Sequence, residues 1–169
     1  MKGLLKDVVI ALVIAFVVIQ FVRPTVVKES SMEPNLNNNN YIFISKMAYK
    51  VGDPEYGDII VFKSNLEMKD GSSKNLIKRV IGLPGDVIKV SENKVYRNGE
   101  LLDEPYIKDQ NNCPGEVEVT VPSGCVFAMG DNREVSIDSR NTEVGCVPEF
   151  TIVGKAFFKL FPIGEAKKL

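Results

Sequence analysis

The sequence predicts a mainly β protein, with an antiparallel β-sheet or distorted-barrel domain preceded by one N-terminal transmembrane helix. Three observations predict this fold class. Residues 8–22 are almost wholly apolar, short β-branched runs separated by turn residues follow them, and no stretch after residue 24 shows an apolar period of about 3.6 residues. We expect a cytoplasmic N-terminus and transmembrane anchor at residues 1–24, and an extracytoplasmic β domain at residues 25–169.

The predicted anchor is the run VVIALVIAFVVIQFV at residues 8–22, in which Gln20 is the polar exception. With a few preceding residues it reaches about 20 residues, and a helix rising ~1.5 Å per residue then spans the ~30 Å hydrocarbon layer. Residues 20–24, at the end of this run, are large, which favours an uncleaved anchor over a cleaved signal peptide. Lys2 and Lys6 predict a cytoplasmic N-terminus, and membrane lipid is an expected partner.

The rest of the chain reads as strands and turns. A polar loop is expected at residues 63–75, and Asn98-Gly99 suits a type I′ turn in a hairpin with the runs VIKV and KVYR. The expected strands cover residues 41–45, 57–62, 76–82, 87–90, 94–97, 116–122, 124–130 and 151–161. Such strands, short and bounded by turns, build antiparallel sheets.

Charge and ligand content exclude several function classes. The net charge is −1, and residues 1–24 are basic, so the remainder is acidic and argues against a nucleic-acid partner. The chain contains no histidine and three cysteines, Cys113, Cys125 and Cys146, so a zinc site would need unlike ligands. We expect no metal and no cofactor. An odd number of cysteines leaves at least one free, and a bridge between Cys113 and Cys125 stays open.

Two adjacent serines, Ser30 and Ser31, follow the predicted anchor in KESSMEPNL. A serine hydroxyl is a poor nucleophile without a base, and the usual base, histidine, is absent. Lysine is the most capable substitute if it is neutral, and burial can lower its pKa from ~10.4 by up to ~3 to 5. The base should therefore lie on an apolar strand. Lys78 in NLIKRVIGLPG and Lys155 in IVGKAFF fit, with a solvated strand position as the alternative for each.

The stretch GDNREVSIDSR at residues 130–140 places five charges and two serines after an apolar strand. As a plain surface turn, it would hold Asp131, Arg133, Asp138 and Arg140 in ion pairs of little energetic value. As a functional loop, its hydroxyls would orient a neutral lysine while its charged pairs fix the loop. From these residues alone, both interpretations stay open.

Together these stretches resemble the type I signal peptidases, the membrane-anchored serine proteases that remove signal peptides from exported proteins. The resemblance runs from the anchor to about residue 160, and the short length is similar to the compact enzymes of Gram-positive bacteria. The matching motifs, in order, are the nucleophile box Ser31-Met32-x-Pro34, the strand GDIIVF, the lysine box IKRVIGLPGD, the last box GDNREVSIDSR and the closing strand IVGKAFF.

The resemblance implies that Ser31 is the nucleophile, Lys78 the general base and Lys155 a structural residue. It implies that Ser136 hydrogen-bonds the lysine amine, and that four charged residues shape the site: Asp131, Arg133, Asp138 and Arg140. It implies signal-peptide-bearing preproteins as substrates, bound in extended form beside the strand around residues 25–28. The residues expected to bind substrate are Thr25, Val27, Met32 and Ile77.

The sequence departs from the family pattern at Glu29, where the family usually has glycine or serine, and at Asn35, where it has threonine. A carboxylate accepts hydrogen bonds and would repel an oxyanion. We therefore expect the oxyanion to be bound by backbone N–H groups, chiefly that of Ser31, with Glu29 turned away.

Two rival functions remain. Self-cleaving repressors of the SOS type use a similar Ser–Lys pair on a β fold, but they carry a DNA-binding domain where this chain has an apolar segment. The second rival is a membrane-anchored β domain that binds exported polypeptides without catalysis, and Glu29 is the best argument for it.

Overall fold

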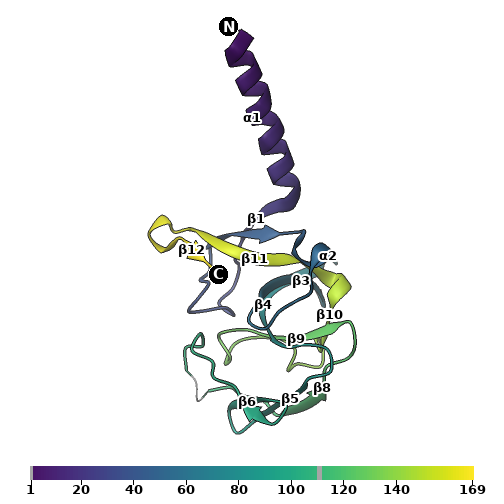
Figure 1. Cartoon of the computed structure of the whole chain (residues 1–169). Helices are drawn as coiled ribbons and strands as arrows, with labels where there is room; N and C mark the ends of the chain where they lie inside the picture. Colours follow the sequence, from purple (N-terminus) through teal and green to yellow (C-terminus); the bar gives the residue numbers. More distant parts are fainter. Residues whose placement is uncertain (1, 110–111) are drawn as a thin grey trace.

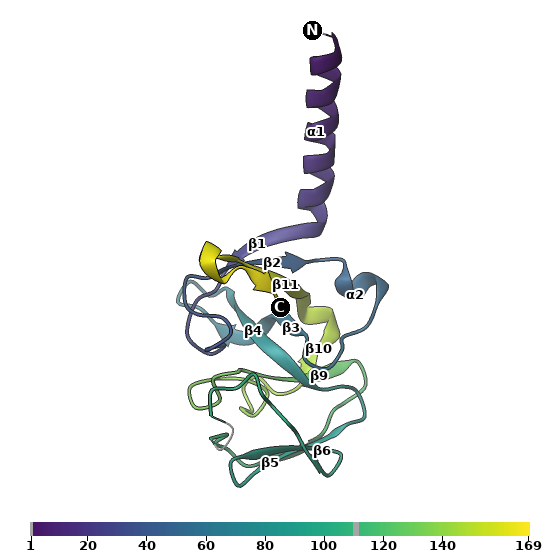
Figure 2. The ribbon, with the colours of Figure 1, turned by 60° about the vertical axis from the view of Figure 1, so that its left-hand side comes forward.

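The computed structural model describes residues 2–109 and 112–169, and it describes side chains outside residues 2 and 13–20. The long helix α1 (Lys2–Phe21) projects from a body made of two β-sheets (Figures 1 and 2). No helix within the described residues is long and apolar enough to cross a membrane. The predicted anchor falls partly on residues 13–20, whose side chains lie outside the described part.

The larger sheet contains eight strands in the order β1-β2-β11-β3-β4-β9-β10, with β12 paired to β11. Every strand pairing within the described residues is antiparallel. The mainly β, antiparallel prediction is confirmed. The strands are β1 (Val22–Val26), β2 (Tyr41–Ser45), β3 (Ile59–Glu67), β4 (Ser73–Gly82), β9 (Cys125–Met129), β10 (Val147–Pro148), β11 (Ile152–Phe161) and β12 (Lys167–Lys168).

The smaller sheet has the order β7-β6-β5-β8 and lies at the end of the body away from α1 (Figure 1). Its strands are β5 (Val87–Ser91), β6 (Lys94–Arg97), β7 (Glu100–Leu101) and β8 (Val117–Thr120). Ile88 and Val90 on β5 are buried while Val87 and Lys89 are exposed, which is the alternation of a sheet packed on one face. Three short helices, which the sequence analysis did not predict, complete the fold: α2 (Ala48–Val51), η1 (Glu149–Thr151) and η2 (Ile163–Glu165).

Two sequence-based expectations need correction. The prediction of a polar loop at residues 63–75 is wrong, because β3 continues to Glu67 and pairs with β4 at Ser73. Only a short turn is left between the two strands. Backbone hydrogen bonds hold this arm, so it needs no apolar side chains. The turn between β5 and β6 is at Glu92-Asn93, both left-handed with φ of 51° and 59°, as a type I′ turn requires. Asn98-Gly99 instead joins β6 to β7.

The core lies on both faces of the β3–β4 pair. Side chains alternate along a strand, so Leu76 and Val80 of β4 share one face with Ile60 and Phe62 of β3 in one apolar cluster. Lys78 lies between Leu76 and Val80 in this alternation and is 1% exposed. The strand pattern therefore carries a lysine side chain into apolar surroundings.

The three cysteines of the chain are all free, so the bridge between Cys113 and Cys125 is not formed.

Candidate active site

The central contact of the site joins two segments that are far apart in the sequence. The Lys78 Nζ donates a hydrogen bond to the Ser31 Oγ at 2.6 Å. Lys78 comes from β4, and Ser31 lies in the loop between β1 and β2. The serine is half-buried and lines an open cleft, while the lysine stem is buried behind it. Of the two lysines that the sequence proposed as a base, Lys78 is the one placed at Ser31. Lys155 instead pairs with Asp58.

Burial controls the charge state of Lys78. Desolvation lowers its pKa from the ordinary 10.5 to about 8, although the negative charges of Asp138 and Glu29 oppose the effect and the positive charge of Lys74 adds to it. An amine with this pKa is partly neutral near pH 7, and a neutral amine can accept a proton.

Apolar packing supports the loop that carries Ser31. Val27 and Met32 are each 1% exposed and pack with Leu36 and Ile42 in one cluster. Both were expected to bind substrate, but neither lines the cleft, because the loop turns their side chains inward. Their contribution to the site is to support the backbone around Ser31.

Two hydrogen bonds tie this loop to the next one. The Asn132 backbone N–H donates to the Ser31 carbonyl at 3.0 Å, and the Asn132 Nδ2 donates to the Ser30 carbonyl at 3.2 Å. Within the described residues, the backbone N–H of Ser31 has no acceptor. It is therefore free to donate to a ligand.

The Glu29 carboxylate binds a lysine and not the serine hydroxyl. The backbone of Glu29 is in the left-handed region, with φ of 76°. Its carboxylate forms an ion pair with the Lys74 Nζ at 2.5 Å. The charge that sequence reasoning placed near the oxyanion therefore has a cationic partner of its own.

Ser136 lies close to Ser31 but does not bind Lys78. A side chain at Gly130 would collide with the Ser136 hydroxyl and with the Ser31 carbonyl, so the absence of a Cβ there lets these groups approach. The Ser136 Oγ is buried and has no hydrogen-bond partner within the described residues. The expected hydrogen bond from Ser136 to the lysine amine is therefore not formed.

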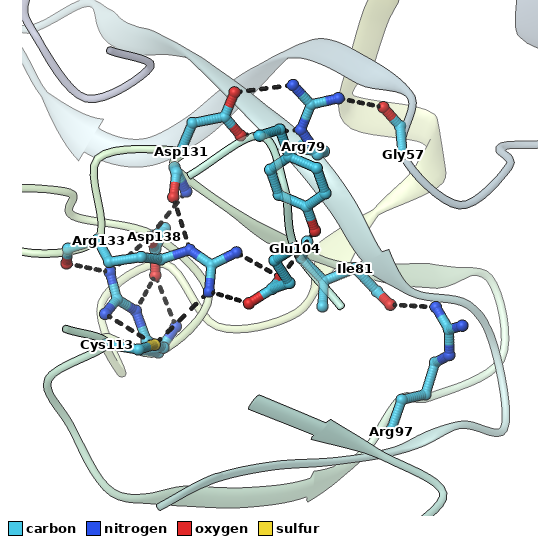
Figure 3. Close-up of polar contacts among 12 residues, drawn as sticks. Gly57, Arg79, Ile81, Arg97, Glu104, Cys113, Asp131, Arg133 and Asp138 are labelled. Carbon is cyan, nitrogen blue, oxygen red and sulfur yellow. Dashed lines mark hydrogen bonds and ion pairs between the residues drawn. The ribbon is translucent and has the colours of Figure 1, made fainter. Parts of the chain in front are cut away.

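Asp131 joins three segments of the site, and Figure 3 shows its contact with Arg79. Its carboxylate accepts hydrogen bonds from the Arg79 Nε and Nη2, both at 2.8 Å, and Arg79 also donates to the Gly57 carbonyl at 2.9 Å. The Asn35 Nδ2 donates to the same carboxylate at 2.8 Å. Arg79 follows the lysine, and Asn35 belongs to the serine loop. Sequence reasoning missed Arg79, although its place beside Lys78 was a signal.

The remaining charged pairs of residues 130–140 are buried, unlike those of a plain surface turn. Arg133 binds both carboxylate oxygens of Glu104, at 2.7 and 2.6 Å (Figure 3), a partner that the sequence analysis did not find. Asp138 binds Arg140 at 2.9 Å and accepts from the Gly130 N–H at 3.0 Å. Burial alone would raise the pKa of the Asp138 carboxyl, but Arg140 and the Gly130 N–H hold it below its usual range.

The cleft beside Ser31 has a volume of about 410 Å³. Thr25, which was expected to bind substrate, lines one side with the chain that continues from β1. Ile77, with the same expected role, lines the other side with β4. β1 pairs with β2 on one edge, and β4 pairs with β9 only from Arg79 onward. Within the described residues, both walls of the cleft therefore present strand edges without a neighbouring strand.

The described residues contain no group of three or more histidine, cysteine, aspartate or glutamate side chains that could hold a metal ion.

A buried amine bonded to a serine hydroxyl, beside open strand edges in an antiparallel β domain, has the form of a serine endopeptidase site. The chain belongs to the family described as signal peptidase, peptidase S26, which it matches over residues 1–161. The membership agrees with the family that the sequence motifs resemble.

Proteins and a solved structure of similar sequence carry the same family name. The chain is 34% identical over 175 residues to signal peptidase I of Bacillus licheniformis, covering 96% of this chain and 90% of that protein. It is 36% identical over 172 residues to signal peptidase I U of Bacillus subtilis, covering 97% and 89%. A crystal structure of a signal peptidase I from Enterococcus faecalis matches with a TM-score of 0.50 and 30% identity, covering 62% of this chain and 97% of that one.

Proposed function

We propose that this protein is a membrane-anchored endopeptidase that removes N-terminal signal peptides from exported preproteins, with Ser31 as nucleophile and Lys78 as general base. The observation that carries the proposal is the 2.6 Å contact between the Lys78 Nζ and the Ser31 Oγ, made by an amine that is buried in an apolar sheet. The family membership and the names of the relatives support the substrate class.

The chemistry begins when the neutral Lys78 amine accepts the proton of the Ser31 hydroxyl. The alkoxide attacks the carbonyl carbon of the scissile bond, and the free backbone N–H of Ser31 stabilises the oxyanion that forms. The protonated amine then gives its proton to the leaving nitrogen, and the acyl-enzyme remains. A water molecule, deprotonated by Lys78, hydrolyses the ester and regenerates Ser31.

The substrate lies extended in the cleft and adds a strand between the open edges of β1 and β4. Main-chain hydrogen bonds provide affinity, while alternate side chains contact the walls of the cleft at Thr25 and Ile77. The family resemblance implies Ala-like residues at the first and third positions before the cut. Val27 and Met32 act from beneath by fixing the serine loop.

The anchor in this proposal is residues 1–24, with a cytoplasmic N-terminus and an extracytoplasmic catalytic domain at residues 25–169. Its support is the apolar run at residues 8–22 and the 20-residue length of α1, which at ~1.5 Å per residue matches the ~30 Å hydrocarbon layer. Leu4, Leu5 and Leu12 on this helix are exposed. An anchor brings enzyme and substrate into one membrane plane, which raises their effective concentration.

The test is cleavage of a purified preprotein with an Ala-x-Ala site by the full chain in detergent. Wild type should cut at that site, Ser31→Ala should not, and Ser30→Ala, which removes a hydroxyl one residue away, is the matched control that should retain activity. Binding of the preprotein without cleavage by any variant would support the non-catalytic alternative and overturn the proposed function.

A further inference from the structure

A second contact besides the Ser31–Lys78 bond joins the walls of the cleft. The Glu29 carboxylate and the Lys74 Nζ are 2.5 Å apart, and both residues line the cleft. Glu29 lies two residues before Ser31, and Lys74 lies four residues before Lys78 on the same face of β4. Within the described residues, this is the one ion pair with both members in the cleft wall. Each partner is thus close to one half of the reacting pair.

The backbone at Glu29 depends on contacts at both ends of the residue. Its φ of 76° is in the left-handed region, which a glutamate rarely adopts without support. The Glu29 backbone N–H donates to the Asn38 Oδ1 at 3.1 Å, and the carboxylate binds Lys74. The side chains of Glu29 and Lys74 are 52% and 32% exposed. With the Asn38 hydrogen bond, this surface ion pair brackets a left-handed residue that lies two positions before the nucleophile.

The pair also completes a pattern of charges around the Lys78 amine. The negative charges of Asp138, Glu29 and Asp131 raise the pKa of the amine, and the positive charge of Lys74 lowers it. Asp138 is paired with Arg140 and Asp131 with Arg79, as Glu29 is with Lys74. Each carboxylate that raises the pKa of the amine is paired with a cation, and the cation limits the size of that increase.

We propose that Glu29 and Lys74 are positioning residues of the Ser31–Lys78 pair, because their ion pair holds the turn before Ser31 against β4 and balances the charge at the Lys78 amine. This inference rests on the proposed function. The two partners act on Lys78 in opposite directions: Glu29 raises the pKa of the amine, and Lys74 lowers it. Opposite shifts would show that the two charges act on the amine electrostatically, because a general loosening of the site would shift both variants in the same direction.

The charge balance is tested by the pH profile of kcat/KM. Glu29→Gln should move the limb that reports Lys78 to lower pH, Lys74→Gln should move it to higher pH, and the double variant should shift less than either. The matched control is the exposed Lys89–Glu118 pair on the small sheet, where Lys89→Gln and Glu118→Gln should shift nothing. Shifts of the same sign in both cleft variants, or no shift in either, would overturn the charge balance.

The positioning is tested by charge reversal. Glu29→Lys places two ammonium groups together, and the opened turn should reduce kcat by roughly tenfold, since small displacements at a reacting centre are costly. Adding Lys74→Glu reverses the pair and should restore most of kcat. Glycine adopts the left-handed backbone without strain but makes no ion pair. Glu29→Gly therefore tests the loss of the ion pair apart from any backbone strain, and kcat should also fall. A reversed pair no more active than Glu29→Lys would refute the positioning role.

A direct titration keeps this test independent of cleavage. The full chain labelled with ¹³C at the lysine ε-carbons can be titrated by NMR, with the Lys78 signal assigned from its absence in Lys78→Arg. The same opposite shifts are expected in Glu29→Gln and Lys74→Gln even if the preprotein is not cut. If the preprotein is not cut but the opposite shifts are seen, the proposed function is rejected and the charge balance stands. If the preprotein is cut but no shifts are seen, the charge balance is rejected and the proposed function stands.

Discussion

Arg79 binds both carboxylate oxygens of Asp131 at 2.8 Å, directly after the lysine that contacts Ser31. Asn35 donates to the same carboxylate, so the strand of the proposed base and the loop of the proposed nucleophile share one buried acceptor. The side chain of Asp131 is fully buried and that of Arg79 is 12% exposed. The geometry of the site thus depends on a charged pair that takes no part in the chemistry.

Breaking this pair should be costly for stability. Arg79→Met leaves the Asp131 carboxylate buried without its cation, and removal of one partner of a buried pair typically costs about 3 to 5 kcal/mol. Urea unfolding of the full chain in detergent measures the loss. Lys89→Met, which breaks an exposed pair, should cost less than about 1 kcal/mol. Equal losses in both variants would show that the Arg79–Asp131 pair has no special role.

Activity should rise with pH through the pKa of Lys78, which burial lowers to about 8. The deprotonated amine is the active form, so kcat/KM should increase about tenfold per pH unit below 8 and level off above it. Initial rates of preprotein cleavage between pH 5.5 and 10, corrected for enzyme stability, test this. A profile that is flat across this range would rule out Lys78 as the base.

Replacement of Lys78 by methionine should stabilise the fold while it abolishes cleavage. The folded state lowers the pKa of the amine from 10.5 to about 8, so below pH 8 the fold carries a buried charge that costs about 3 kcal/mol. Stability of the wild type should rise between pH 8 and 10.5, as the folded state loses its proton first. The advantage of Lys78→Met should therefore be largest at pH 7 and vanish above about pH 10.5. A lower stability of Lys78→Met at pH 7 would contradict this.

Ser136→Ala separates chemistry from stability. The Ser136 Oγ is buried without a partner in the described part of the chain, so its removal should leave the free energy of unfolding unchanged or raise it by about 1 kcal/mol. Because the hydroxyl is expected to orient Lys78 in the substrate complex, kcat should fall although thermal stability does not. An unchanged kcat would contradict that role. Gly130→Ala is the contrasting variant, since its new methyl group collides with Ser136 and with the Ser31 carbonyl, and both quantities should fall.

Met32→Ala should act on stability more than on substrate choice. Met32 is 1% exposed and packs beneath the serine loop, where such truncations cost about 2 to 5 kcal/mol. Ile77→Ala, in the cleft wall, should instead change KM and the residues accepted before the cut. Altered cleavage specificity in Met32→Ala, without a loss of stability, would return that residue to the substrate-binding role that its motif suggested.

Several parts of this molecule were readable from local sequence. The strands at residues 41–45 and 94–97 match β2 and β6, because their apolar alternation and turn residues act over a few positions. The polar arm of β3 and β4 was not readable, since backbone pairing there depends on the partner strand. The short helix α2 has four residues, too few for any period to be seen.

The sequence by itself determined that this chain has no histidine base, so that lysine is the most capable base if the serine is a nucleophile, and that a lysine among apolar strand residues would be desolvated. Both conclusions follow from side-chain chemistry and from the two-residue period of a strand. Only the tertiary structure decided which residues meet: Lys78 with Ser31, Arg79 with Asp131, and Glu29 with Lys74. It also placed the side chains of Val27 and Met32 in the core. The reason is that these contacts join segments far apart in the chain, and local patterns show which face a side chain occupies but not which loop packs against it.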